Sequence, residues 1–146
     1  MNIAIRYQSR NGNTRAVAET IANIAGVEAK TIDEPLRGHI DILFIGGGVY
    51  MWDADKELID FLKNLDKKQI GQIAAFSTTG TMTATIKRIC EYADKMGILV
   101  NENKLCIKML IQGHSAFGLQ GGKLKAPQIE KIRKFTEEVL NCLLYT

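Results

Sequence analysis

Hydrophobic and polar positions follow two alternating patterns along the chain. Short stretches that are almost wholly apolar, or that alternate apolar and polar residues, predict strands. Longer stretches with apolar residues at every third or fourth position predict helices that bury one face. The expected strands cover residues 2–7, 27–32, 40–47, 72–77 and 104–113, and the expected helices cover residues 14–25, 55–65, 83–97 and 126–144.

The regular alternation of strands and helices is typical of parallel sheets whose crossover helices cover both faces. We therefore predict an α/β fold, a three-layer sandwich in which a five-stranded parallel sheet has helices on both faces. The chain contains no low-complexity tract, internal repeat or linker. Residues 1–146 are accordingly expected to form a single domain.

Charge and composition narrow the functional classes. The formal net charge is +3 and the lysines are scattered, so nothing indicates binding to nucleic acid. No apolar window is long enough for a membrane span, and the N-terminus lacks the features of a secretory signal, so a cytoplasmic protein is expected. Cys90, Cys106 and Cys142 are odd in number and have no Cys-x-x-Cys spacing. They are predicted to be buried free thiols.

The segment between the first expected strand and the first expected helix reads YQSRNGNT, residues 7–14. Its short hydroxyl and amide side chains precede a helix N-terminus, where backbone N–H groups and the helix dipole favour an anion. It has neither the Gly-Lys-Ser/Thr of a nucleoside-triphosphate loop nor the three glycines of a dinucleotide fingerprint. A phosphomonoester fits this loop. The same residues also suit a helix cap with a tight turn, and both interpretations stay open.

Two further loops are expected at the same edge of the sheet, because the carboxyl ends of parallel strands lie together there. GGGVYMWDAD, residues 46–55, places two large aromatic residues after three glycines, and STTGT, residues 77–81, is small and hydroxylated. Aromatic side chains in such a loop suggest that they cover a flat ring, whose polar rim the hydroxyls would bond. The alternative interpretation is a satellite core beneath the loop.

Few other residues are candidates for chemistry. His114 follows the fifth expected strand, where it is either simply exposed or relays a proton near a cofactor. His39 is expected in a surface loop. Asp53, Asp55 and Glu57 stand at the start of a helix whose dipole they complement. No metal site is predicted, because no His, Cys or carboxylate set has metal-ligand spacing. The paired acidic residues of a phosphoacceptor receiver domain are missing as well.

Taken together, these features make the chain similar to flavodoxins. The phosphate loop of that family, Thr/Ser-x-Thr-Gly-x-Thr, is matched by Ser9, Gly12 and Thr14, while Asn11 replaces the middle threonine. The resemblance implies the strand order 2-1-3-4-5 and the cofactor FMN, with its phosphate on the first loop and its ring between the other two. The expected cofactor-binding residues are Ser9, Arg10, Asn11, Gly12, Asn13, Thr14, Gly47, Gly48, Val49, Tyr50, Met51, Trp52, Ser77, Thr78, Thr79, Gly80, Thr81 and His114. No catalytic residue is assigned.

The resemblance implies electron transfer of the flavodoxin type with redox partner proteins, but two departures keep alternatives open. Electron-transfer flavodoxins are usually strongly acidic, whereas this chain carries a charge of +3. Many of them also flip a peptide at a glycine beside the flavin, and residues 51–55 contain no glycine. One alternative is a small FMN-dependent reductase or oxidase acting on a quinone-like acceptor, because GGGVYMW also resembles flavodoxin-like quinone and protoporphyrinogen oxidising enzymes. Another is a flavodoxin-fold binding module that has lost its flavin.

Overall fold

The computed structural model describes residues 1–10, 12–50, 53–78, 84–109 and 124–144. The helices are α1 (Asn13–Ala25), α2 (Lys56–Lys63), α3 (Ala84–Met96) and α4 (Ala126–Leu144). The strands are β1 (Ile3–Tyr7), β2 (Ala29–Thr31), β3 (Ile40–Tyr50), β4 (Asp53–Ala54), β5 (Ile70–Thr78), β6 (Leu99–Val100) and β7 (Leu105–Ile107). All four expected helices are confirmed, each within a few residues of its predicted ends.

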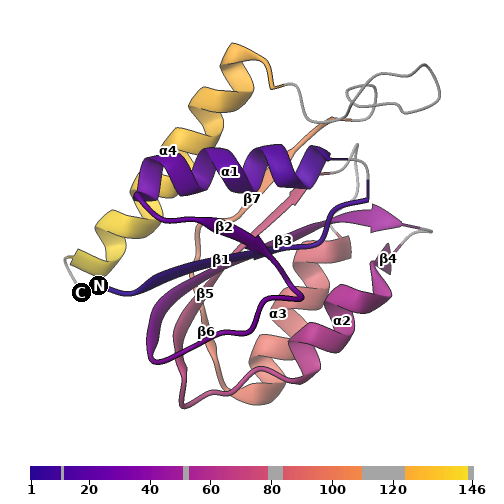
Figure 1. The fold of residues 1–146 in the computed structure, drawn as a ribbon, viewed down its shortest axis with the longest axis vertical. Coiled ribbons are helices and arrows are strands. Elements are labelled where there is room, and N and C mark those ends of the chain that lie inside the picture. Colours follow the sequence, from indigo (N-terminus) through magenta and orange to yellow (C-terminus); the bar gives the residue numbers. More distant parts are fainter. Residues whose placement is uncertain (11, 51–52, 79–83, 110–123, 145–146) are drawn as a thin grey trace.

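The strands form one sheet in the order β2-β1-β3-β5, and β6 and β7 both pair with β5 at its free side (Figure 1). These pairings are all parallel. The order confirms the expected arrangement, with β7 in the place of the fifth predicted strand. Two short strands were not predicted. They are β6 and β4, the latter running antiparallel to β3.

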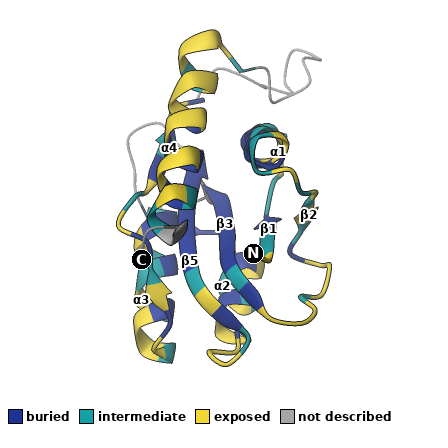
Figure 2. Cartoon of the chain, turned by 90° about the vertical axis from the view of Figure 1, so that its left-hand side faces the viewer, coloured by how far each residue is buried: buried dark blue, intermediate teal, exposed yellow. Residues whose placement is uncertain are grey.

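Helices cover both faces of the sheet, as the alternation predicted. Helices α1 and α4 lie together on one face, and α2 and α3 lie on the other (Figure 1). The central strands β3 and β5 are buried between the two layers (Figure 2). On the α1 and α4 side, the rings of Phe44 and Phe135 meet edge to face with their centroids 5.9 Å apart. Apolar side chains on both faces of the sheet therefore hold the three layers together.

The glycine triplet belongs to a strand, which corrects the prediction of a loop over residues 46–55. Strand β3 continues through the glycines to Tyr50, and its backbone then pairs antiparallel with β4. A Cβ at Gly46 would lie only 2.3 Å from a ring carbon of Phe76 on the neighbouring strand. Packing against this ring, rather than a turn, therefore explains why glycine is needed at Gly46.

The last strand is shorter than residues 104–113, which were predicted to form it. Strand β7 ends at Ile107, and residues 110–113 lie outside the described residues. The carbonyl of Lys108 accepts a hydrogen bond from Nε2 of Gln128 on α4, at 2.9 Å, instead of joining the ladder. Between β6 and β7, the backbone N–H of Asn101 still bonds the Ile73 carbonyl at 2.7 Å. The edge of the sheet beside β5 therefore consists of two short strands, β6 and β7.

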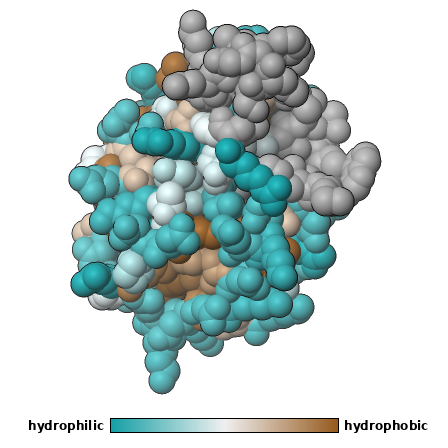
Figure 3. Space-filling model, turned by 45° about the vertical axis from the view of Figure 1, so that its right-hand side comes forward, coloured by the Kyte–Doolittle hydropathy of each residue, from teal (hydrophilic) through white to brown (hydrophobic). Residues whose placement is uncertain are grey.

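The surface is mostly hydrophilic, although hydrophobic residues gather at the floor of a hollow in one face (Figure 3). None of the helices that the structure describes is both long and apolar enough to cross a membrane. Among the described residues, Cys90, Cys106 and Cys142 form no disulfide, as predicted, but they are half-buried rather than buried. Burial raises the pKa of the Cys90 and Cys106 thiols. His39 is exposed, as expected, and lies 3.2 Å from a carboxylate oxygen of Asp41.

Candidate functional site

The first loop leads from β1 into the uncapped beginning of α1. Gly12 is the N-cap residue and has a positive φ of 91°, a conformation that glycine adopts without strain. Its backbone N–H donates to Oγ of Ser9 at 3.0 Å, which closes the turn. Because Gly12 has no side chain, no side-chain group caps the first turn of α1 within the described residues. The loop is therefore a tight turn, as one interpretation predicted, but no side-chain cap accompanies it among the described residues. Binding of an anion at this helix N-terminus stays a prediction.

Thr14 connects the first loop to the end of β5. Its Oγ1 lies 2.7 Å from Oγ1 of Thr78, and the Thr14 residue is only 1% exposed. A hydroxyl can donate one hydrogen bond and accept others, so this contact leaves Thr14 able to bond a further group. Next to it, the side-chain amide of Asn13 donates to the Met109 carbonyl at 3.2 Å. Two predicted site residues, Thr14 and Thr78, are therefore in direct contact.

An ion pair joins the first loop to the segment that follows β4. Arg10 donates from Nε and Nη2 to one carboxylate oxygen of Asp55, each at 2.7 Å. The other oxygen of Asp55 accepts the backbone N–H of Glu57 at 2.9 Å and so caps α2. Asp55 is almost wholly buried, with 3% of its side chain exposed, whereas Arg10 is 57% exposed. The Asp55 carboxylate therefore connects the first loop to the start of α2 and fixes the distance between them.

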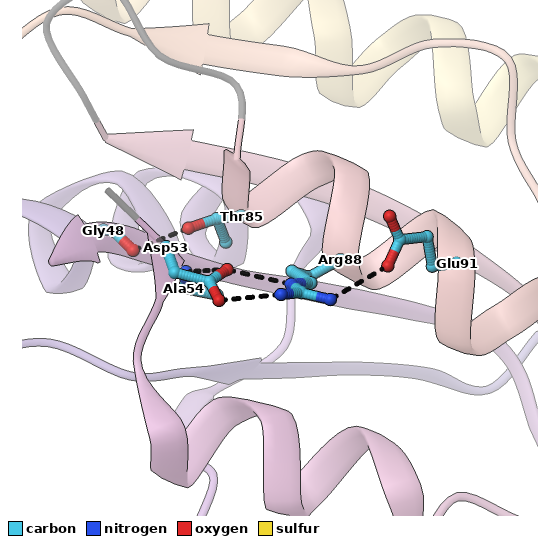
Figure 4. A network of polar contacts seen from close by, with 6 residues as sticks. All are labelled: Gly48, Asp53, Ala54, Thr85, Arg88 and Glu91. Atoms are coloured by element: carbon cyan, nitrogen blue, oxygen red, sulfur yellow. Dashed lines mark hydrogen bonds and ion pairs between the residues drawn. The ribbon is translucent and has the colours of Figure 1, made fainter. Parts of the chain in front are cut away.

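A second network fixes the β3–β4 hairpin on helix α3 (Figure 4). Arg88 donates from Nε and Nη2 to the two carboxylate oxygens of Asp53, each at 2.9 Å, and also bonds Glu91. The Arg88 guanidinium lowers the pKa of the Asp53 carboxyl, chiefly through its hydrogen bonds to it. Thr85 donates its hydroxyl to the Gly48 carbonyl at 2.6 Å. Hydrogen bonds from α3 therefore fix the β3–β4 hairpin, which carries part of the predicted ring site.

Ser77 is the one described residue whose buried side chain lacks a polar partner. Its Oγ is fully enclosed and makes no hydrogen bond. In register, Ser77 lies opposite Gly47, at the carboxyl ends of β5 and β3. Buried hydroxyls without partners are rare, which makes the ends of these two strands unusual. This is the edge of the sheet where the first loop also lies.

Several predicted site residues lie outside the described residues. They are Asn11, Met51, Trp52, Thr79, Gly80, Thr81 and His114. For Val49 and Tyr50 only the backbone is described, as the end of β3. The described part of the chain brings together Ser9, Arg10, Gly12, Asn13, Thr14 and Thr78 on one side, and places Gly47, Gly48 and Ser77 on neighbouring strands.

Sequence reasoning missed Arg88 and Thr85, because both stand within an ordinary amphipathic helix pattern. It interpreted Asp53 and Asp55 as complements of the α2 dipole. Asp55 does cap α2, but Asp53 lies in β4 and pairs with Arg88. No group of three potential metal ligands occurs among the described residues.

The donors of the first loop fit a phosphate group. A phosphomonoester at the start of α1 would meet backbone N–H groups of an uncapped helix turn, the positive end of its dipole and the hydroxyl of Ser9. The Arg10 guanidinium, from the same loop, adds positive charge nearby. The chemistry of these residues therefore suits an anion.

Comparison with known families identifies the family to which the chain belongs. The family described as "Flavodoxin domain" matches residues 4–142, and the chain therefore belongs to the flavodoxin domain family. A comparison with curated protein sequences finds no match.

Solved structures share the fold at low sequence identity. A flavodoxin from the domain Archaea superposes with a TM-score of 0.76 at 19% identity, covering 97% of both chains. Flavodoxin 2 from Bacillus cereus gives 0.71 at 16% identity, covering 97% of this chain and 99% of the other. Rubredoxin oxygen:oxidoreductase from Desulfovibrio gigas gives 0.70 at 13% identity, covering 99% of this chain but 36% of the other. These likenesses establish the fold.

Proposed function

We propose that this protein binds FMN and transfers electrons as flavodoxins do. The observation that carries the proposal is the start of α1, where Gly12 leaves the first helical turn without a side-chain cap at the carboxyl end of β1. Such a turn binds a phosphate through its backbone N–H groups. Membership of the flavodoxin domain family supports FMN as the molecule that bears this phosphate.

In this proposal the chain binds and orients the cofactor, and FMN supplies the redox chemistry. Residues 9–14 hold the phosphate. The ring lies between residues 47–52 and 77–81, with His114 beside it. The ion pair of Arg10 with Asp55 and that of Arg88 with Asp53 set the spacing of the loops. The free thiols are consistent with the cytoplasm as the expected location.

The direct test is a titration with FMN, followed by flavin absorption and by quenching of flavin fluorescence. We expect Thr14→Val to weaken FMN binding about tenfold or more, because a hydrogen bond to a charged group contributes roughly 1.5–3 kcal/mol. Valine keeps the volume of Thr14 in its buried position. Riboflavin, which lacks the phosphate, should bind far less tightly to the parent protein and should hardly distinguish it from the variant.

Thr20→Val is the matched control, because Thr20 lies on the same helix and bonds only the Ala16 carbonyl among the contacts described for it, at 2.9 Å. It should bind FMN like the parent. Equal FMN affinity in Thr14→Val and the parent would contradict the phosphate assignment. A parent protein that binds neither FMN nor riboflavin would instead identify a flavodoxin-fold module that has lost its flavin.

One observation favours the alternative of a small FMN-dependent reductase or oxidase with a quinone-like acceptor. The glycines that could flip a peptide toward the flavin are Gly47 and Gly48, and both are paired in register with β5. The Gly48 carbonyl is also held by the Thr85 hydroxyl at 2.6 Å. A flip of this peptide would break that buried hydrogen bond. The flip would therefore be costly, and this loop does not favour the one-electron form of the flavin.

Stepwise anaerobic reduction of the FMN-bound protein distinguishes a flavodoxin-type electron carrier from an FMN-dependent reductase or oxidase. If the protein is the reductase or oxidase, the oxidised flavin should lose its absorption in a single two-electron step, because the Thr85 hydroxyl holds the Gly48 carbonyl. Thr85→Val removes this hydrogen bond and should increase the share of one-electron reduction, whereas Thr20→Val should not. A parent protein that passes through a strongly coloured one-electron stage would indicate a conventional electron carrier with redox partner proteins.

A further inference from the structure

A cavity beside strands β1 and β2 is lined by none of the expected cofactor-binding residues. Its volume is about 640 Å³, and its lining includes Ile3 at the start of β1 and Ile40 at the start of β3. The flavin site, by contrast, lies beyond the carboxyl ends of these strands. Residues 32–39, which connect β2 to β3 and contain no helix or strand, supply part of its lining. Ile32 and Leu36 of this mostly exposed segment pack in the same core as α2 and α3, so the segment lies on that face of the sheet, beside the two helices.

A buried guanidinium belongs to the lining of this cavity. Arg6 is only 7% exposed and donates to three backbone carbonyls, those of Ile5 at 3.0 Å, Glu34 at 3.0 Å and Pro35 at 2.9 Å. A guanidinium has five N–H groups, so two are left over. None of the ion pairs among the described residues includes Arg6. Backbone carbonyl dipoles therefore stabilise its positive charge, and the Glu34 carboxylate, which also favours that charge, lies beyond ion-pair distance.

Further positive charge converges on the same cavity. Lys30 on β2 lies directly opposite Arg6 in the parallel register, so the two side chains stand on one face of the sheet. Like charges opposite one another on neighbouring strands are unfavourable. Arg37, from the covering segment, also lines the cavity, whereas Glu34 is the one acidic residue among the lining residues. Three cationic side chains thus face one carboxylate, and a bound anion would relieve their repulsion.

We propose that this cavity binds a small multivalent anion that carries phosphate or carboxylate groups, held by Arg6, Lys30 and Arg37. The volume is within the range of about 300–1,000 Å³ that is usual for small-molecule sites. Ile3, Ala4 and Val27 supply an apolar part of the lining, which suits an anion with an organic body. The site is separate from the FMN site, and its test does not depend on the proposed electron transfer.

The experiment is isothermal titration of the protein, first without FMN and then with FMN in excess, at low ionic strength, with inorganic pyrophosphate in one arm and citrate in the other. We expect one-to-one binding of at least one of them, which also identifies phosphate or carboxylate as the preferred group. Lys30→Gln and Arg37→Gln should each weaken binding about threefold or more, and the double variant about tenfold or more. Both residues are exposed, so the substitutions leave the fold intact.

Lys134→Gln is the matched control. It removes one positive charge from an exposed position on α4, on the opposite face of the sheet, and should bind the anion like the parent. Three results would overturn the proposal: neither anion binds, the control weakens binding as much as Lys30→Gln does, or binding appears without FMN and disappears when FMN is added. The last result would place the anion on residues 9–14 instead.

Discussion

Gly46→Ala should lower the free energy of unfolding by about 3 kcal/mol, the upper end of the usual cost of overpacking a core. The added Cβ would lie 2.3 Å from a ring carbon of Phe76 and 2.5 Å from the Phe76 carbonyl oxygen. Neither neighbour can move easily, because Phe76 lies in the centre of the sheet with no exposed surface. Urea unfolding followed by far-ultraviolet circular dichroism measures the change.

Gly47→Ala shows whether the contact with Phe76, rather than any added Cβ in this strand, causes the loss of stability. Its Cβ would meet the far end of the Leu58 side chain at 2.9 Å, and the next nearest atom is 3.6 Å away. Because a leucine methyl can shift, we expect a cost of about 1 kcal/mol. Equal destabilisation by the two substitutions would mean that the contact with Phe76 does not set the cost at Gly46.

These glycines also show why part of the fold could not be predicted. In a single sequence, three glycines followed by aromatic residues indicate a loop. The actual constraint comes from Phe76, a residue on another strand that the sequence pattern does not connect with Gly46. The long helices, by comparison, could be predicted closely, because their apolar periodicity extends over several turns. Strands β4 and β6 have two residues each, too few for any periodicity to show.

The candidate site could also be predicted only in part. The first loop was recognisable because its residues are contiguous and stand directly before a helix. The contacts that hold it could not be inferred, since Arg10 and Asp55 are 45 residues apart, and Asp53 and Arg88 are 35 apart. Such pairs come together only through the order of the strands. The charge of Asp53 and Asp55 was visible in the sequence, but their two different partners were not.

The pair of Arg10 with Asp55 gives the second large expected effect. Arg10→Ala should lower the free energy of unfolding by about 2 kcal/mol, because it leaves the Asp55 carboxylate, with 3% of its side chain exposed, without its cation. We set this value below that of a fully buried pair, since Arg10 is 57% exposed and partly screened by water. Arg15→Ala, which removes an exposed arginine paired with Glu19, is the control and should leave the free energy of unfolding almost unchanged.

A second substitution separates an uncompensated buried charge from simple loss of packing. Asp55→Asn keeps a good N-cap residue for α2 but removes the negative charge. If the buried charge causes the loss, Arg10→Ala combined with Asp55→Asn should be more stable than Arg10→Ala alone. A double variant as unstable as the sum of the two single variants would instead assign the effect to packing. Because Asp55 ties residues 9–14 to the segment after β4, we also expect FMN affinity to fall in Arg10→Ala. That affinity should not recover in the double variant, since restoring stability does not rebuild the connection between the two loops.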